Sequence, residues 1–370
     1  MPIRTTPVSP IVGLFAAVAV VASIGVAAPA SADPWKPGYR EYAGVGSVVT
    51  AGMWDVLTNG RANIAGGAVT VPSVASFDPV GSATIQTKAG VAAIARPGSN
   101  AGIDALMASP TQVDFARVAN RPRYEAGMAF DKITYLPIAR DAVSVVAFKL
   151  GYDVLNFNRE DLTAIYSCTA AGDVSVVGSG STAQVFFAGG EVKRQIRPVL
   201  PTGTGDVRAF FLRAIGVTTP GACVQTSPTF AENDASVLSA DGSIVPFLVS
   251  SYIAQKNGIT PRTMNDYEHT ILSINGERPL ASTMEPQIPP LMPGPLYGRA
   301  AYPPGTQRGV FSRDVYNVVR SPSLGTPLIA ALTTQLATPT ARMVLNRAGF
   351  KNLDYIGQPN RFLPGPYPLE

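Results

Sequence analysis

The chain has 370 residues, of which 46% are hydrophobic and 15% are charged, and its formal net charge is +4 at pH 7. This composition is typical of a packed globular protein and excludes a disordered chain. The basic residues are scattered singly along the sequence, so it offers no electrostatic footprint for nucleic acid, and we expect no nucleic-acid partner.

The N-terminus has the layout of a secretory signal. Arg4 precedes an apolar run over 11–28, and Ala30-Ser31-Ala32 places small residues at the positions that signal peptidase reads. We expect a signal peptide over 1–32, cleaved near Ala32, and a secreted chain that begins at Asp33. The alternative is a retained membrane anchor, for which the run is short and is interrupted by Gly and Ser. No Cys ends the run, so we expect no lipid anchor.

The length that remains favours two lobes, because 338 residues (370 minus 32) exceed what one hydrophobic core usually supports. Strand patterns alternate with helix patterns along this part, which predicts an α/β architecture with mainly parallel sheets. In chain order these segments are a helix over 50–57, a strand over 83–94, a helix over 103–107, a strand over 113–116, two strands around Arg140-Asp141 within 133–148, a helix over 158–166, strands over 174–177 and 196–200, and helices over 328–336 and 340–348.

Two further segments connect these elements. The apolar stretch 244–254 leads into a chain return. Between Pro286 and Pro304 seven prolines fall within nineteen residues, so this segment cannot pair in a central strand. We interpret it as an extended surface strap between the lobes.

The cysteine and histidine content limits the chemistry. Cys168 and Cys223 both lie in the exported part, where a lone pair most simply forms a disulfide; free buried thiols are the alternative. His269 is the single histidine, which excludes most zinc sites and disfavours Ser-His-Asp catalysis. We interpret His269 as a surface or lobe-boundary residue, and Glu232-Asn233-Asp234 as a solvated turn, since calcium needs alternating ligands. We therefore expect no metal, no cofactor and no enzymatic activity.

Three Gly/Ser or Gly/Thr turns precede helices, at Gly46-Ser47, Gly98-Ser99 and Thr202-Gly203-Thr204-Gly205. The first amides of a helix have no partner within it, so such turns can hold an anion, and in doubly wound sheets they lie at the edge where ligands bind. The alternative for the third turn is an ordinary N-cap before an amphipathic helix that carries Phe210 and Phe211. Asp114 is either the acceptor for a protonated oxyanion or a plain cap.

In this order and spacing the motifs resemble the periplasmic phosphate-binding proteins of ABC importers, and more closely their divergent exported relatives in high-GC Gram-positive bacteria. The matching segments run through most of the mature chain and are Gly44-Val45-Gly46-Ser47, Gly98-Ser99-Asn100-Ala101-Gly102-Ile103, Val113-Asp114-Phe115-Ala116, Leu162-Thr163-Ala164-Ile165-Tyr166, and Gly203-Thr204-Gly205 with Phe210. The resemblance implies a type II periplasmic-binding fold, in which two α/β lobes are joined by two crossings and close on a ligand in the cleft. The implied division is lobe I over 33–140 plus 250–370 and lobe II over 141–249.

The resemblance also implies a set of ligand contacts. By carry-over from the family's motifs these are Ser47, Val48, Val49, Ser99, Asp114, Arg117, Thr202, Gly203, Thr204 and Gly205, where Arg117 is a new contact beside Val118. Three positions depart from the family. Asp206 replaces a Thr and places a carboxylate where it would repel a dianion, Val118 replaces a Ser, and Val48 replaces a hydroxy residue. The family's Arg falls near Leu200, so the phosphate site is only partly intact.

Two functions follow from these observations. The first is a secreted solute-binding protein, expected to be a monomer, that captures phosphate or another small oxyanion and delivers it to an ABC permease. The second is a cell-surface or cell-wall binding module that keeps the fold but has lost phosphate binding, which the missing lipid-anchor Cys favours. A phosphate-ester hydrolase is disfavoured because the chain lacks metal-ligand clusters and a nucleophile with a base.

Overall fold

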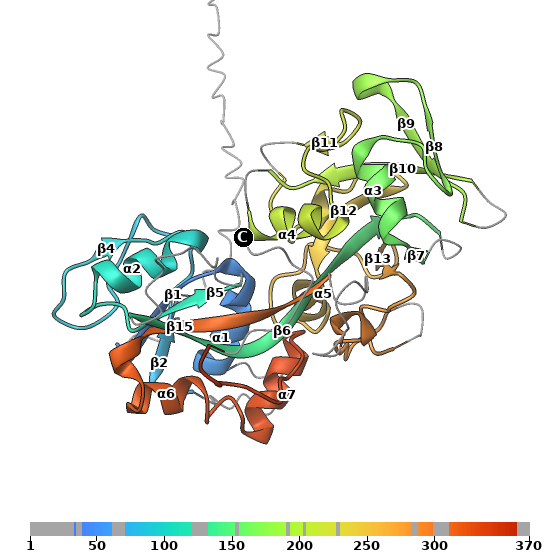
Figure 1. Ribbon diagram of the computed structural model, residues 1–370. Coiled ribbons are helices and arrows are strands. Elements are labelled where there is room, and N and C mark those ends of the chain that lie inside the picture. The colour runs from blue at the N-terminus through green and yellow to red at the C-terminus, as the bar shows by residue number, and fades with distance from the viewer. Residues whose placement is uncertain are drawn as a thin grey trace, which may run out of the picture.

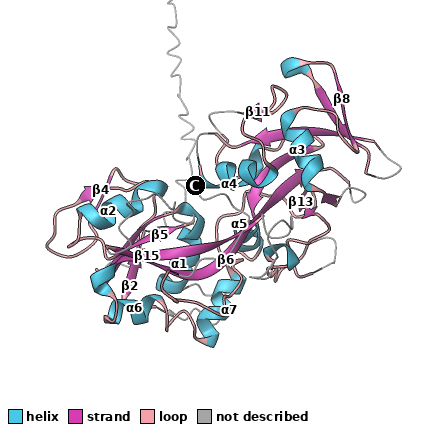
Figure 2. Cartoon of the chain, viewed as in Figure 1, coloured by secondary structure: helices cyan, strands magenta, loops and turns pink. Residues whose placement is uncertain are grey.

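The computed structural model describes residues 33–34, 39–60, 71–119, 132–151, 155–189, 193–202, 205–226, 230–282, 287–298 and 311–360. The predicted signal peptide over 1–32 lies outside these residues. Two α/β lobes lie side by side, and long strands run from one to the other (Figure 1). Helices lie on both faces of the sheet in the first lobe (Figure 2). Within the described residues, no helix is both long enough and apolar enough to cross a membrane.

One eleven-stranded sheet passes through both lobes in the order β2-β1-β5-β15-β6-β12-β10-β9-β8, with β11 on β10 and β13 on β6. The strands of the first lobe are β1 (Tyr42–Gly46), β2 (Val74–Ser76), β5 (Phe115–Val118) and β15 (Ser312–Arg320). Those of the second lobe are β8 (Val174–Val177), β9 (Gln184–Phe187), β10 (Arg194–Leu200), β11 (Gln225–Thr226), β12 (Ser243–Leu248) and β13 (His269–Ile271). Two small sheets pair β3 (Thr84–Ile85) with β4 (Ile94–Ala95) and β7 (Asn156–Phe157) with β14 (Ser273–Ile274).

The helices follow the same division. The first lobe contains η1 (Val48–Thr50), α1 (Ala51–Asn59), η3 (Ser99–Ala101), α2 (Gly102–Ala108), α6 (Pro327–Leu332) and α7 (Pro339–Arg347). The second contains α3 (Arg159–Ser167) and α4 (Asp206–Ile215), and α5 (Val249–Lys256) follows β12. The predicted helix over 158–166 is confirmed as α3, because Asn158 and Asp161 form a reciprocal capping box.

One long strand, β6 (Ile133–Phe148), runs through both lobes. Its residues up to Ala142 pair with β15, and those from Val143 pair with β12. The prediction of two strands around Arg140-Asp141 is therefore wrong. Arg140 pairs across the strands with buried Asp314 at 2.8 Å, and this neutralised pair lets the strand continue through the polar residues. Two lobes that share β6 and β15 as crossings confirm the predicted two-lobe type II fold.

Other details of the sheet differ from the predictions. Parallel pairs (β1 with β2 and β5, β10 with β11 and β12) alternate with antiparallel pairs along β6, β15 and β9, so the sheet is mixed rather than mainly parallel. The strands at the crossing, β6 and β15, run antiparallel to each other, and each also runs antiparallel to its other main neighbour, β12 or β5. The segment 83–94 is mostly loop between two-residue strands. Only Ile85 and Thr87 of this segment are buried, which is too few buried positions for a longer strand.

The predicted disulfide is confirmed. Cys168 and Cys223 are bonded, with their Cα atoms 6.0 Å apart. Cys168 ends α3 in a left-handed conformation (φ 56°), and its Sγ also accepts the amide hydrogen of Cys223 at 3.1 Å. The bond ties the C-terminus of α3 to the loop that follows α4.

The Pro-rich strap is described only over 287–298. There it is more buried than a surface strap would be. Leu291 and Tyr297 are 1% and 0% exposed, and the Tyr297 hydroxyl donates to the carbonyl of Gly349. Residues 288–290 remain exposed, whereas 291–298 packs largely into the core, so this part is not a surface strap.

Candidate functional site

The first predicted turn forms at the end of β1. Gly46 has φ 116°, and a Cβ there would lie 2.4 Å from the carbonyl oxygen of Arg117, so the position requires glycine. The amide of Ser47 donates to the same carbonyl oxygen at 2.9 Å. The Ser47 hydroxyl accepts the amide of Val49 at 3.2 Å, which starts the η1–α1 segment.

The second turn lies directly against the first. Ser99 begins η3, and its hydroxyl accepts the amide of Val48 at 3.1 Å. A Cβ on Gly102 would lie 2.9 Å from the Cα of Gly46, so a larger residue would push the turns apart. The structure thus brings Ser47, Val48 and Ser99 together, as the sequence predicts for two of the three turns.

Both hydroxyls meet one carboxylate oxygen of the opposite lobe. Ser47 Oγ lies 3.1 Å, and Ser99 Oγ 3.0 Å, from Asp206 Oδ2. Asp206 is the first residue of α4 and is only 5% exposed, so these bonds are shielded from water. Asp206, which departs from the family's Thr, therefore accepts hydrogen bonds from both serine hydroxyls of the first lobe.

A second carboxylate holds the beginning of α4. Glu232 Oε1 accepts the amides of Val207 at 2.9 Å and Arg208 at 3.0 Å. Gly205 precedes the helix without a side-chain cap, and a Cβ there would lie 2.3 Å from Glu232 Oε1. Burial raises the pKa of Glu232, nearby Asp206 raises it further, and the two amides oppose the change. We call Ser47, Ser99, Asp206 and Glu232 the interlobe cluster.

The cap by Glu232 corrects the interpretation of residues 232–234 as a solvated turn. The side chain reaches back across 25 positions to the helix start, and no local pattern announces such a contact. Asn233 is also engaged, because its Oδ1 accepts the amide of Leu248 at 3.0 Å. Of the third turn, the amide of Thr202 donates to the carbonyl of Phe230, while Gly203 and Thr204 lie outside the described residues.

Charged residues of the two crossing strands lie behind this cluster. The Arg313 guanidinium stacks 4.3 Å from the ring centroid of Phe210 on α4, and its charge favours the ionised forms of Asp141 and Glu232. Asp141 is wholly buried, and its Oδ1 accepts the amides of Ala142 at 2.7 Å and Ser250 at 3.2 Å. Burial raises the pKa of Asp141 to about 6, against the opposing effects of Arg313 and these hydrogen bonds.

Asp114 lies elsewhere. It precedes β5, where its Oδ2 accepts the amide of Ala43 at 2.8 Å and lies 2.7 Å from Lys88 Nζ. Because β1 and β5 are parallel, Asp114 is at the amino end of the strands and Ser47 at the carboxyl end. Of the two interpretations of Asp114, the structure gives the plain cap and does not bring it to the interlobe cluster.

Arg117 also has a different environment from the one predicted. Its side chain is 0% exposed, and Nη2 donates to the carbonyls of Gly46 at 3.2 Å and Phe77 at 2.6 Å. Burial lowers the pKa of Arg117 to about 10, and Asp78 and Asp33 oppose this change from a distance. Arg117 follows Phe115 by two positions, so both side chains lie on the α1 face of the sheet.

Arg117 belongs to a group of buried polar side chains under α1. The Nε and Nη1 atoms of Arg117, both amide atoms of Asn317, Thr50 Oγ1 and Trp54 Nε1 make no hydrogen bond to the part of the chain that the structure describes. All four residues are 0% exposed. At about 1–3 kcal/mol for each unsatisfied buried group, six such atoms would cost about 6–18 kcal/mol, as much as a domain's whole stability of about 5–15 kcal/mol. We call Thr50, Trp54, Arg117 and Asn317 the α1 polar cluster.

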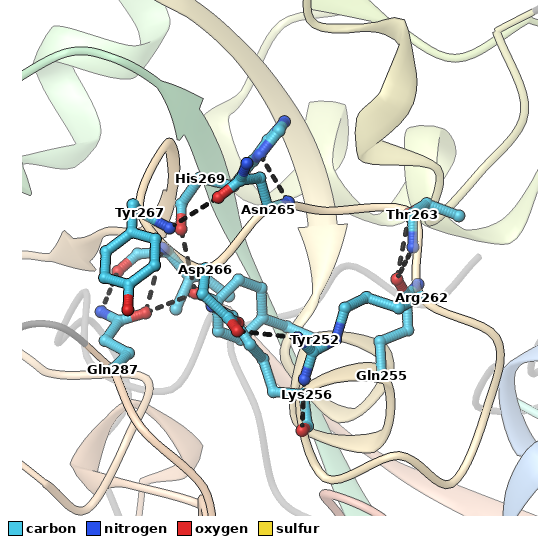
Figure 3. A network of polar contacts seen from close by, with 11 residues as sticks. Tyr252, Gln255, Lys256, Arg262, Thr263, Asn265, Asp266, Tyr267, His269 and Gln287 are labelled. Carbon is cyan, nitrogen blue, oxygen red and sulfur yellow. Dashed lines mark hydrogen bonds and ion pairs between the residues drawn. The ribbon is translucent and has the colours of Figure 1, made fainter.

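The single histidine is a structural residue. His269 is 6% exposed, so of its two predicted positions, the surface and the lobe boundary, the surface is wrong. Its Nδ1 accepts the amide of Asn265 at 3.0 Å, and its Nε2 lies 3.2 Å from the carbonyl oxygen of Ala235 (Figure 3). Burial lowers the pKa of His269. In the same network Lys256 Nζ lies 2.8 Å from Asp266, and the Tyr252 hydroxyl donates to Gln287 at 2.6 Å (Figure 3).

Among the described residues, no three His, Cys, Asp or Glu side chains are grouped in a way that would hold a metal ion. A surface hollow of about 250 Å³ lies beside β6 and β13 of the second lobe and is lined by Lys149, Tyr267 and Glu268 among others. None of Ser47, Ser99 and Asp206 lines it.

No protein-family model matches the chain, and no curated protein matches it. Among solved structures it is similar to an ABC-type phosphate transport receptor from Vibrio cholerae (14% identity, TM-score 0.48, covering 85% of this chain and 100% of that chain). It is also similar to a putative phosphate ABC transporter substrate-binding protein with bound phosphate from Clostridium perfringens (12% identity, TM-score 0.49, covering 85% and 99%). At these identities and scores the likeness is one of fold and transfers no ligand contact.

Proposed function

We propose that this chain is a non-enzymatic, secreted solute-binding protein that captures a small oxyanion between its lobes, with phosphate the first candidate. One observation supports this most directly. Hydroxyls from two separate turns, Ser47 and Ser99, both donate to a single carboxylate oxygen of Asp206. Donors converging from different segments on one negatively charged oxygen are the arrangement an oxyanion requires.

Capture would proceed by displacement. The oxyanion takes the two hydroxyls from Asp206, and the Asp206 carboxylate turns toward solvent as the lobes part. Opening and closing would bend the chain where β6 passes from its pairing with β15 to its pairing with β12. The reaction exchanges one anionic acceptor for another, so the serine donors are satisfied both before and after binding.

The proposal also covers the transport partner and the place of the ligand. The V. cholerae and C. perfringens proteins are named as a phosphate transport receptor and a substrate-binding protein of a phosphate ABC transporter. By analogy, a monomer of this chain would hand its ligand to an ABC permease. The ligand would lie between the lobe that carries Ser47 and Ser99 and the lobe that carries Asp206. The predicted boundaries, 33–140 plus 250–370 and 141–249, shift at β13, which pairs with the second-lobe half of β6.

Isothermal titration of residues 33–370 with phosphate, sulfate and acetate tests the proposal. We expect heat with at least one of these anions, and an affinity about tenfold or more weaker in Ser99→Ala, which loses one hydrogen bond to a charged acceptor. Ser181→Ala is the matched control, since Ser181 is exposed and distant in the second lobe. Absence of heat with all three anions, in the wild type and in Asp206→Ala, would favour a surface module that has lost anion binding.

A further inference from the structure

The α1 polar cluster lies in one place although its residues come from three segments. Asn317 on β15 is directly opposite Arg117 on β5 in the strand register, so their side chains share a face of the sheet. Trp54 packs on Phe115 of the same face, with ring centroids 5.3 Å apart. Thr50 precedes Trp54 by one helical turn and therefore lies nearer the carboxyl ends of the strands, level with Arg117.

The cluster is rich in hydrogen-bond donors. Arg117 has unbonded N–H groups on Nε and Nη1, Trp54 has one on Nε1, and Asn317 has two on Nδ2. The acceptors in the cluster are Asn317 Oδ1 and the hydroxyl of Thr50, which is also a donor. Donors therefore outnumber acceptors, and water, with two donors of its own, would leave several N–H groups without an acceptor.

The α1 polar cluster also carries a positive charge, that of Arg117. Arg117 makes its two hydrogen bonds to neutral carbonyls, those of Gly46 and Phe77. The carboxylates that influence it, Asp78 and Asp33, act at longer range, and Asp33 forms its ion pair with Arg96 at 2.7 Å. A buried guanidinium with no carboxylate in contact is a favourable partner for a counter-ion.

We propose that the α1 polar cluster binds a small monovalent anion such as chloride, in a buried site separate from the interlobe cluster. Arg117 supplies the charge, and Trp54, Asn317 and Thr50 supply neutral donors around the ion. The Arg117 guanidinium donates to carbonyls of the first lobe, those of Gly46 and Phe77, whereas the Ser47 hydroxyl bonds to Asp206 of the second lobe. The two sites share no side chain, so this one does not depend on the proposed capture of a solute.

Two measurements on residues 33–370 test this site. In crystals grown with sodium bromide, we expect an anomalous difference peak within hydrogen-bond distance of Arg117 Nε or Nη1. In solution, we expect the thermal midpoint to rise in a saturable way when chloride replaces gluconate at constant ionic strength. A bromide-soaked crystal with only water density beside Arg117 would overturn the proposal.

Conservative variants separate binding from folding. Thr50→Val removes one donor while keeping shape, and Trp54→Phe removes one while keeping an aromatic ring. Each should weaken the apparent chloride affinity about tenfold or more, as expected for one hydrogen bond to a charged acceptor. Thr58→Val is the matched control on α1, since Thr58 is equally buried but already donates to the carbonyl of Trp54 at 2.8 Å. A chloride response that is the same in all three variants and the wild type would contradict the assignment.

Discussion

The contact between Asp206 and the two serines makes a strong prediction about solute binding. In Asp206→Ala the hydroxyls of Ser47 and Ser99 lose their carboxylate acceptor, and the lobes lose the two hydrogen bonds that join them at this point. We therefore expect the unliganded chain to open. We also expect an oxyanion to bind more tightly, because it no longer competes with an internal carboxylate.

The size of the effect follows from the geometry. Hydrogen bonds to a charged acceptor contribute about 1.5–3 kcal/mol each, and distances of 3.0 and 3.1 Å suggest the lower end for both. Two such bonds amount to about 3 kcal/mol, which corresponds to an affinity gain on the order of 100-fold. Asp206→Asn retains one acceptor oxygen without the charge and should give a smaller gain.

Two assays on residues 33–370 check this reasoning. Small-angle X-ray scattering should show a larger radius of gyration for unliganded Asp206→Ala than for the wild type, and titration calorimetry with phosphate should show the tighter binding. Asp354→Ala, which removes an exposed carboxylate, is the control for net charge. Unchanged scattering together with equal or weaker phosphate binding in Asp206→Ala would refute the displacement argument.

Three further predictions concern stability. The pKa of Asp141 is raised from 3.8 to about 6, so between these pH values the folded state binds more protons than the unfolded state. The unfolding free energy should therefore fall by about 3 kcal/mol through this group as the pH rises across that window. Urea unfolding should show that Asp141→Asn gains stability relative to wild type between about pH 4 and pH 7. Replacing Cys168 and Cys223 by Ser opens a loop of 55 residues and should lower the unfolding free energy by about 4 kcal/mol, measured against wild type with and without reductant. Arg140→Met leaves a buried carboxylate unpaired and should cost about 3–5 kcal/mol, whereas Lys149→Met, which breaks an exposed ion pair, should leave the denaturation midpoint nearly unchanged.

Local patterns were sufficient to predict many elements of this fold. The capping residues of α3 lie within four positions of each other, and the helices α1, α2 and α7 also follow periodic apolar residues. The continuity of β6 could not be predicted in this way. A strand with Arg140 and Asp141 at its centre looks interrupted until Asp314, 174 positions away, is known to pair with Arg140.

The same limit applies to the site. The Gly46-Ser47 and Gly98-Ser99 turns were recognisable because glycine and serine at a helix start have a local physical reason. Glu232 was not, since its contact with the start of α4 depends on where the connection between β11 and β12 lies in the fold. Motif matching also placed Asp114 in the site, although the parallel register puts it at the opposite end of the strands from Ser47.

The two carboxylates of the interlobe cluster have different consequences for the ligand. Asp206 bonds to residues of the opposite lobe, so its contacts break when the lobes separate. Glu232 bonds to Val207 and Arg208, which follow Asp206 on the same helix, so its contacts persist in any arrangement of the lobes. A solute can displace Asp206 but still meets Glu232, which occupies two amides at the start of α4. Ligands of lower negative charge should therefore lose less to repulsion there than a dianion does, and the competition between sulfate and acetate at one pH reports directly on that repulsion.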